Sequence, residues 1–383
     1  MPNEQEMKRL SASHVRPYPP SDPADLETQH MMGDIWRNGI NFLIISGAPG
    51  VGKTRAAEDY VAQLLNDHNA KHNLQECRIT ELFADYTTKI YSQAEITSIL
   101  QTNSIEFVWD IIVLHPQYSY EDLIRGSRFA PGNGLDMLIE VREGILGFIS
   151  RVVSSISSIR PESPYPRGIL IMDEINRAPI GQLFGEAIYA LDRRGTPVTT
   201  PYYINDIGSS ISIPKELFVV ATMNSIDRSI SGFDFALRRR FSLLNLASNI
   251  NPITDRWLKF GENYRKFAEN IYDSVKKVIM NATPRGIVPR EELILGHAFF
   301  LPPKHIVQPE KAVDWLANAY TYKILPTLMD YAEQGLLDYG QQHMEIFEAG
   351  VLNGEKSLAT VKCTLIEEQM LLLLKQITEN PSQ

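Results

Sequence analysis

The sequence predicts an α/β protein: an αβα sandwich with a parallel five-stranded core sheet, followed by an all-α segment. Compact apolar runs alternate with helical patterns up to about residue 246, and strand signals stop beyond Asn249. Each run is continuously apolar, as expected for a strand covered on both faces. The expected strands are Phe42–Ser46, Ile111–His115, Gly168–Asp173, Leu217–Thr222 and Phe241–Leu246.

Helical periodicity fills the intervals and the C-terminal third. A helix with one apolar face is expected after the first strand, and a second such helix is expected after Asp173. Further helices are expected over 257–277, 313–334 and near 357–377. These patterns divide the chain into an extended tail (1–25), where several prolines oppose a helix, an α/β domain (26–248) and a helical domain (249–383).

Composition narrows the class of protein. The chain has 383 residues, of which 44% are hydrophobic and 22% charged, which suits a soluble two-domain protein. A net charge of -9 argues against a free-standing nucleic-acid binder. Two distant cysteines, Cys77 and Cys363, suit a reducing compartment. With no secretory signal and no apolar run long enough for a bilayer, a cytoplasmic protein without a membrane partner is expected.

A glycine-rich loop follows the first strand. It reads Gly47-Ala-Pro-Gly-Val-Gly-Lys-Thr54 and satisfies the pattern G-x-x-x-x-G-K-[ST]. Main-chain N–H groups of such a loop surround phosphate oxygens at a helix N-terminus. Lys53 would reach the β- and γ-phosphates, and the Thr54 hydroxyl would bind Mg²⁺. The predicted nucleotide-binding residues in this loop are Gly47, Pro49, Gly50, Val51, Gly52, Lys53 and Thr54.

Two acids end the apolar strand Ile169-Leu-Ile-Met-Asp173-Glu174. This places both carboxylates at the carboxyl edge of the sheet. Asp173 would hold Mg²⁺ through water, and Glu174 would orient and deprotonate the attacking water. Acids at strand ends are common, so this pair alone is weak evidence for a hydrolytic site. The phosphate loop upstream is what favours that interpretation.

Two later segments complete a candidate hydrolytic site. Asn224 ends the run Val219–Asn224; it would either cap a turn or hold the catalytic water and γ-phosphate as a sensor. Arg238, Arg239 and Arg240 precede the last strand; they would either be solvated or supply at least one arginine to a neighbouring subunit's site.

The order of phosphate loop, acidic strand, sensor and arginines resembles the plan of the AAA+ NTPases, in which the helical segment would be the lid. Longer stretches resemble the McrB-type branch, near the MoxR and dynein-related group. They are His115–Asp122, Asp173–Ala178, Met223–Ser229, Asp234–Phe241, Ile294–Phe300 and Tyr322–Leu328. The likeness runs from about residue 41 to about residue 331 and is most specific between Met223 and Phe241.

The resemblance implies a ring, a hexamer by family analogy, with ATP or GTP and Mg²⁺ as cofactors. It also implies a McrC-like nuclease partner through which the protein would act on DNA indirectly, in restriction or antiviral defence. Asn224 and Asp227 fall where the family was compared with a guanine-reading motif, but the lysine of that motif is missing, so the choice of base stays open. The family's N-terminal DNA-reading domain has no counterpart before the motor, so target recognition is expected from a partner or from an insertion. Residues 197–214 suggest such an insertion, a β-hairpin that is either a pore element or ordinary surface.

Two alternatives to a nuclease-activating motor remain open. One is a MoxR-like chaperone ATPase that acts on a protein partner. The other is a nucleotide-gated scaffold that scarcely hydrolyses, against which Glu174 and the arginine run argue.

Overall fold

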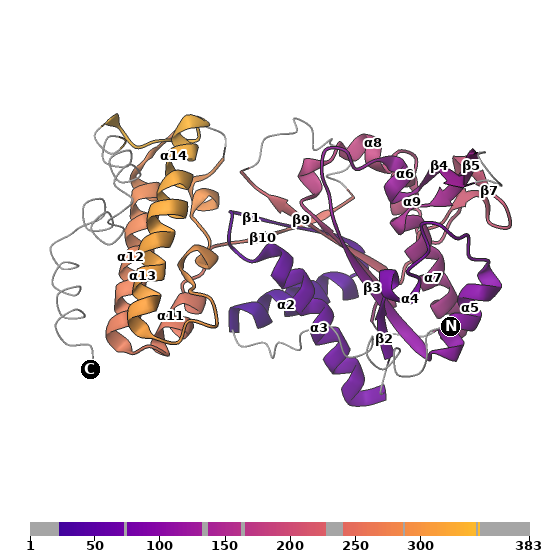
Figure 1. Ribbon diagram of the computed structural model, residues 1–383, viewed down its shortest axis with the longest axis horizontal. Coiled ribbons are helices and arrows are strands. Elements are labelled where there is room, and N and C mark those ends of the chain that lie inside the picture. Colours follow the sequence, from indigo (N-terminus) through magenta and orange to yellow (C-terminus); the bar gives the residue numbers. More distant parts are fainter. Residues whose placement is uncertain are drawn as a thin grey trace. The chain divides into compact units, whose positions relative to one another are not determined.

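The computed structural model describes residues 23–72, 75–131, 137–161, 165–226, 240–285, 288–341 and 344. By internal contacts the chain divides into two compact units. The first holds Thr54–Met223, the described residues before Gly47, and residues 240–244. The second holds Gly47–Lys53, Asn224–Ile226 and the described residues from Asn245 onward. Figure 1 shows the elements of both units.

A six-stranded sheet has the order β10-β1-β9-β6-β3-β2. The pairings of β2 with β3, of β3 with β6 and of β6 with β9 are all parallel. The strands are β1 (Phe42–Gly47), β2 (Gln75–Arg78), β3 (Ile105–Val113), β6 (Gly168–Asp173), β9 (Leu217–Asn224) and β10 (Ser242–Leu246). The predicted α/β class with a central parallel sheet is therefore confirmed.

Two details of the sheet differ from expectation. β2 was not predicted, because its four residues, Gln-Glu-Cys-Arg, are polar and lie at the edge of the sheet. β3 begins at Ile105 rather than Ile111, since Glu106 and Asp110 interrupt its apolar run. Asp110 is nevertheless buried, and its carboxylate accepts hydrogen bonds from Arg78 and from the main-chain N–H of Thr80.

Helices cover both faces of the sheet (Figure 1). Alternate residues of β1 and β9 point to opposite faces. On one face Phe218 contacts Trp36 of α2 (Pro23–Arg37) and Tyr60 of α3 (Lys53–His72). On the other, Ile44 and neighbouring strand residues share a core with α7 (Ile145–Ile159). The remaining helices of this unit are α4 (Ile79–Leu82), α5 (Gln93–Thr102), α6 (Tyr120–Leu123), η1 (Ile175–Arg177), α8 (Ile180–Phe184) and α9 (Ala187–Asp192).

α2 begins at Pro23, a residue expected to oppose a helix. Proline is tolerated in the first turn because its missing N–H would be unpaired there in any case. The helix begins inside the predicted tail (1–25), and residues 1–22 lie outside the described chain.

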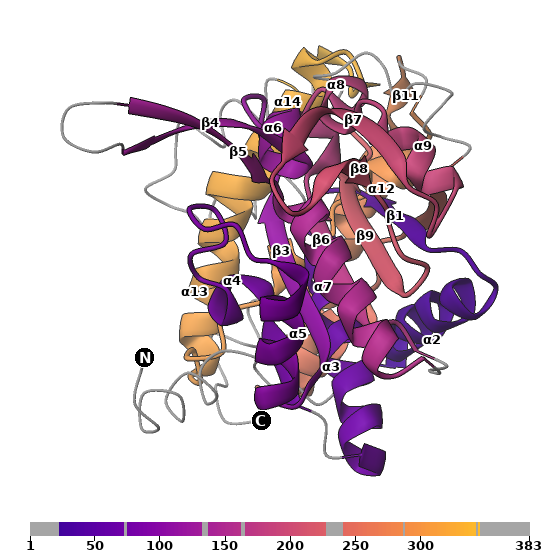
Figure 2. The same ribbon diagram turned by 90° about the vertical axis from the view of Figure 1, so that its right-hand side faces the viewer.

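Two antiparallel hairpins extend from the first unit. β7 (Val198–Ile204) and β8 (Gly208–Ile211) form the hairpin expected over residues 197–214. Its turn contains Asp206 and Gly208 with φ values of 65° and 87°. The second hairpin, β4 (Arg125–Pro131) with β5 (Met137–Glu143), was not predicted and projects from the sheet in Figure 2.

The second unit is built from helices, as the sequence predicts for this segment. They are α11 (Asn251–Leu258), α12 (Glu262–Asn281), η2 (Arg290–Leu293), η3 (His297–Phe300), α13 (Pro309–Ala319), η4 (Tyr320–Ile324) and α14 (Leu325–Glu333). A short pair, β11 (Thr283–Pro284) and β12 (Leu337–Asp338), accompanies them. The helix expected over 257–277 is interrupted at Gly261, whose φ is 118°.

A local π-helical turn lies within the helix expected over 313–334. Pro326 lacks a main-chain N–H, and the Leu325 N–H bonds five residues back to Tyr320. The last expected helix, residues 357–377, lies outside the described residues. In the part of the chain that the structure describes, no helix has both the length and the apolar character needed to cross a bilayer.

Candidate functional site

Asp173 lies at the carboxyl end of β6, where the sequence places an acidic site. Its Oδ1 accepts a hydrogen bond from the Thr54 hydroxyl at 2.6 Å and another from the Thr222 hydroxyl at 2.5 Å. Thr54 is the second residue of α3, the helix after the phosphate loop, while Thr222 belongs to β9. The structure therefore brings together the hydroxyl and the carboxylate that were predicted to share Mg²⁺. Oxygen atoms of this kind are the ligands that Mg²⁺ prefers.

Thr222 is a site residue that the sequence did not reveal. Its side chain is buried, and its hydroxyl oxygen also accepts a hydrogen bond from the Glu174 main-chain N–H at 3.1 Å. One side chain thus orients Asp173 and fixes the backbone of Glu174. The only sequence signal was a hydroxyl near the end of an otherwise apolar strand.

Glu174 turns sharply away from the strand. Its φ and ψ are 57° and 49°, a left-handed conformation that costs a non-glycine residue about 1–3 kcal/mol. The carboxylate is three-quarters buried, and its Oε2 lies 3.5 Å from Arg177 Nε. That distance makes a long ion pair. The Glu174 carboxylate therefore follows Asp173 directly in the chain. Because Glu174 has left the extended conformation, its side chain does not continue the alternation of side chains along β6.

A further carboxylate, Glu58, is influenced by the acidic strand end. Burial raises the pKa of Glu58, and the negative charges of Asp59 and Asp173 raise it further. Glu58 lies one turn beyond Thr54 on α3. Asp173 is thus close enough to act on Glu58, although burial is the larger cause of the shift.

The phosphate loop has the backbone that its glycines allow. Gly50 and Gly52 have φ values of 78° and 86°, a region that side-chain-bearing residues rarely adopt. Lys53 Nζ donates hydrogen bonds to the carbonyl oxygens of Gly47 and Ala48, both at 2.9 Å. The Lys53 ammonium group therefore lies against the loop in which the phosphates are predicted to bind.

Residues 296–300 pack directly against this loop. The Gly296 N–H donates to the Pro49 carbonyl at 2.9 Å, and the Ala298 N–H donates to the Gly50 carbonyl at 3.0 Å. A Cβ built on Gly50 would lie 2.7 Å from the Phe299 ring. The loop and η3 thus belong to one compact unit.

His297 lies on the same segment. Its Nε2 is 3.6 Å from the position that a Cβ on Gly52 would take. A histidine beside an apolar run is usually a core residue, so His297 is not among the predicted site residues. Lys304 lies exposed beyond η3. The signal that was missed is Gly296, whose lack of a side chain permits the close approach to the loop.

Asn224 ends β9, as predicted. Its Oδ1 accepts a weak hydrogen bond from the Ile226 N–H at 3.4 Å, the turn-capping contact that asparagine commonly makes. The neighbouring Ser225 N–H donates to the Gly47 carbonyl at 3.2 Å, which ties this turn to the start of the phosphate loop. The sensor role stays a prediction, and Asp227 lies outside the described residues.

The arginine run is only partly described. Arg238 and Arg239 lie outside the described residues. The Arg240 side chain is 3% exposed, and its Nη2 lies 2.6 Å from Asp192 Oδ2. This intrachain pair makes Arg240 unsuitable for reaching another subunit. The proposal of an arginine that acts between subunits is therefore narrowed to Arg238 and Arg239.

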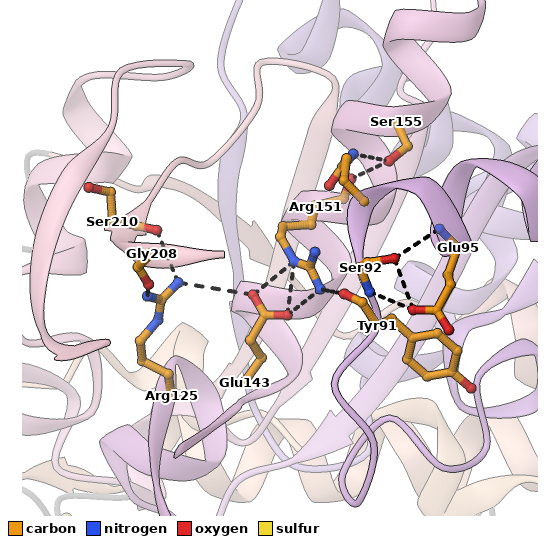
Figure 3. A network of polar contacts seen from close by, with 10 residues as sticks. Tyr91, Ser92, Glu95, Arg125, Glu143, Arg151, Ser155, Gly208 and Ser210 are labelled. Atoms are coloured by element: carbon orange, nitrogen blue, oxygen red, sulfur yellow. Dashed lines mark hydrogen bonds and ion pairs between the residues drawn. The ribbon is translucent and has the colours of Figure 1, made fainter. Parts of the chain in front are cut away.

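A buried arginine fastens the β7–β8 hairpin to the α/β unit (Figure 3). The Arg125 side chain is 1% exposed and donates to the carbonyl oxygens of Gly208 and Ser210, both at 3.0 Å. Burial lowers the pKa of Arg125, while the nearby Glu143 carboxylate acts in the opposite direction. The Tyr202 hydroxyl adds a bond to Glu121 at 3.0 Å. The bonds from Arg125 thus tie β8, beside the turn of the hairpin, to the rest of the α/β unit.

The network continues inward from Glu143 (Figure 3). Arg151 of α7 binds the Glu143 carboxylate through Nε, at 3.0 and 2.9 Å, and through Nη2 at 2.7 Å. The same guanidinium donates to the Tyr91 carbonyl at 2.7 Å. Glu143 therefore links the two arginines, and the buried charges compensate one another. This network is structural and was not foreseen from the sequence.

Comparison with known proteins finds relatives that are named as parts of restriction enzymes. No protein-family model matches the chain. The chain is 25% identical over 296 residues to the type IV methyl-directed restriction enzyme EcoKMcrB subunit of Escherichia coli (strain K12), which covers 76% of this chain and 53% of that protein. It thus spans about half the length of that relative. It is 27% identical over 297 residues to the type II restriction enzyme BsuMI component YdiS of Bacillus subtilis (strain 168), which covers 74% of this chain and 76% of that one.

Two solved structures also match, with low scores. C. elegans PCH-2 gives a TM-score of 0.29 at 12% identity and covers 87% of this chain and 68% of its own. NtrX from Brucella abortus in complex with ADP gives 0.33 at 10% identity and covers 98% and 71%. These TM-scores are too low to bear on the argument. The phosphate loop, the acidic strand end and the two restriction-enzyme relatives identify the chain as a P-loop NTPase related to the McrB-type AAA+ proteins.

Proposed function

We propose that this chain hydrolyses ATP or GTP in an oligomeric ring and that turnover drives a partner protein, a McrC-like endonuclease of a restriction system. The observation that carries the hydrolytic part is the hydrogen-bonded set of Thr54, Asp173, Thr222 and Glu174. Both relatives are named as parts of restriction enzymes, which supports the restriction context. The ring and the partner are inferred from the AAA+ resemblance.

Each residue has a role in the proposed reaction. Main-chain amides of the phosphate loop and Lys53 would hold the phosphates. Thr54 and Asp173 fit Mg²⁺, which when bound neutralises charge on the β- and γ-phosphate oxygens. The Glu174 carboxylate takes a proton from the attacking water as the water oxygen bonds to the γ-phosphorus. The bond from that phosphorus to the bridging oxygen breaks, and the electron pair stays on the diphosphate.

The proposed base, Glu174, lies beside an arginine. Its carboxylate faces Arg177 at 3.5 Å, so it must accept a proton from water while an arginine lies nearby. Asn224 would orient the same water, and Arg238 or Arg239 of an adjacent subunit would stabilise charge on the transferred phosphoryl group.

The test is a Glu174→Gln variant, because glutamine keeps the shape and removes the base. We expect nucleotide binding and assembly to persist while kcat falls by about 10²–10⁴-fold. A matched control is Glu81→Gln on α4, where the side chain is exposed. Normal turnover in Glu174→Gln would remove Glu174 from the mechanism.

The partner is tested separately. Purification with the product of a neighbouring nuclease gene, followed by ATP and GTP hydrolysis with and without DNA, should show turnover stimulated in the complex. A partner without nuclease activity that is remodelled during turnover would instead favour a chaperone of the MoxR kind.

A further inference from the structure

A basic cavity of about 770 Å³ lies in the first unit, away from the acidic strand end. Asn41 and Lys215 line it and lie just before β1 and β9, at the amino ends of these strands. Asp173 ends β6 at the carboxyl edge of the sheet. The cavity is therefore separate from the proposed hydrolytic residues. Its lining consists of Trp36, Arg37, Gly39, Asn41, Asp192, Arg193, Arg194 and Lys215.

The lining carries a local excess of positive charge. Four of its eight residues are cationic and one is acidic, in a chain whose net charge is -9. The acidic residue, Asp192, already pairs with Arg240 at 2.6 Å. Arg37 pairs with Asp34 at 2.6 Å, but both side chains are about two-thirds exposed, so this pair is weak.

Arg194 provides a fixed cation in the wall. Its guanidinium donates to the carbonyl oxygens of Pro214, Asn41 and Leu217 at 2.8–3.1 Å. Burial lowers the pKa of Arg194 to about 9, while Glu216 opposes that shift, so the group stays charged at neutral pH. Among the described residues no carboxylate forms an ion pair with it. An anion in the cavity would compensate this charge.

Arg193 and Lys215 provide adjustable cations at the mouth. Both are exposed, and within the described ranges neither forms an ion pair. Gly39 has no side chain, and a Cβ placed there would have no atom within 4 Å. The cavity is consequently open on this side. Long side chains around an open mouth can follow an extended ligand more readily than they can enclose a small one.

We propose that this cavity binds adjacent phosphodiester groups of a nucleic-acid strand. A DNA duplex carries about one negative charge per 1.7 Å of axis, so neighbouring phosphates can meet several cations within one cavity. Guanidinium groups suit phosphate oxygens because they offer paired donors. Half-buried Trp36 adds an aromatic wall. This site goes beyond the proposed hydrolysis, since it gives the chain a direct contact with nucleic acid.

The test measures binding of a fluorescein-labelled DNA duplex by the full-length protein at several salt concentrations. The variant is Arg193→Glu with Lys215→Glu. The matched control is Lys276→Glu with Lys277→Glu on α12, where both lysines are exposed and the change in net charge is the same. We expect the cavity variant to raise the DNA dissociation constant at least about tenfold and to reduce the salt slope by about two, while the control changes little.

Equal weakening in both variants would overturn the proposal, because diffuse charge would then explain binding. Loss of self-assembly in the cavity variant alone would make the surface a subunit contact. Tighter binding of a polyglutamate peptide than of DNA would identify an acidic protein segment as the ligand, and full competition by equimolar pyrophosphate would identify a small phosphate compound. Unchanged NTP turnover in the cavity variant would show that the loss is not caused by misfolding.

Discussion

The contact between Gly296 and the phosphate loop can be tested with one methyl group. A Cβ at Gly296 would overlap main-chain atoms of Gly50 and Val51, which cannot move aside as a flexible side chain could. Gly296→Ala must therefore separate the segment from the loop and break the Gly296–Pro49 and Ala298–Gly50 hydrogen bonds. At about 1 kcal/mol each, these bonds predict a loss of about 2 kcal/mol in the free energy of unfolding.

The same displacement should weaken nucleotide binding. If the free energy of nucleotide binding falls by the same amount, about 2 kcal/mol, the nucleotide dissociation constant rises about 30-fold. Urea unfolding and titration with a fluorescent nucleotide measure the two effects. Gly181→Ala is the matched control, because a Cβ there meets no atom within 4 Å, and its stability should stay within about 1 kcal/mol of the parent. A Gly296→Ala protein with unchanged stability and affinity would refute the role of this contact.

Three further substitutions probe other contacts. Thr222→Val removes the hydroxyl that orients Asp173, and kcat should fall about tenfold, or about 1.4 kcal/mol, in steady-state hydrolysis with retained affinity. Arg125→Met removes two charged hydrogen bonds to the β7–β8 hairpin and should cost about 3 kcal/mol in urea unfolding, whereas a loss below 1 kcal/mol would contradict the network. Burial and the bond to Glu186 raise the pKa of Tyr120. The neutral Tyr120 side chain therefore contributes to the free energy of unfolding below pH about 10, and this contribution is lost as the pH rises further. Tyr120→Phe should flatten the alkaline decline in stability.

The elements with strong local signals were predictable from the sequence. β6 lies where its apolar run indicated, and Asp173 ends it as expected. The phosphate loop was recognisable because its glycines and lysine occur at fixed spacing before a helix. The positions of β6 and of the loop before α3 could be predicted because each depends on residues within one short segment.

Features that depend on distant contacts were not predictable. β2 is stabilised by pairing with β3, although its own residues are polar. Thr222 gained its role only when β9 lay beside β6. Gly296 reads as an ordinary loop glycine until its approach to Gly50 is known. In each case the decisive neighbour is far away in the chain, and no local pattern marks it.

The central claim is that the loop ending in Lys53 and Thr54 binds the nucleotide phosphates. Nucleotide titration of Lys53→Ala, with folding verified by unfolding in urea, tests it most directly. We expect Lys53→Ala to lose affinity for ATP and GTP while the folded structure is retained. A folded Lys53→Ala protein that binds and hydrolyses nucleotide like the parent would contradict it.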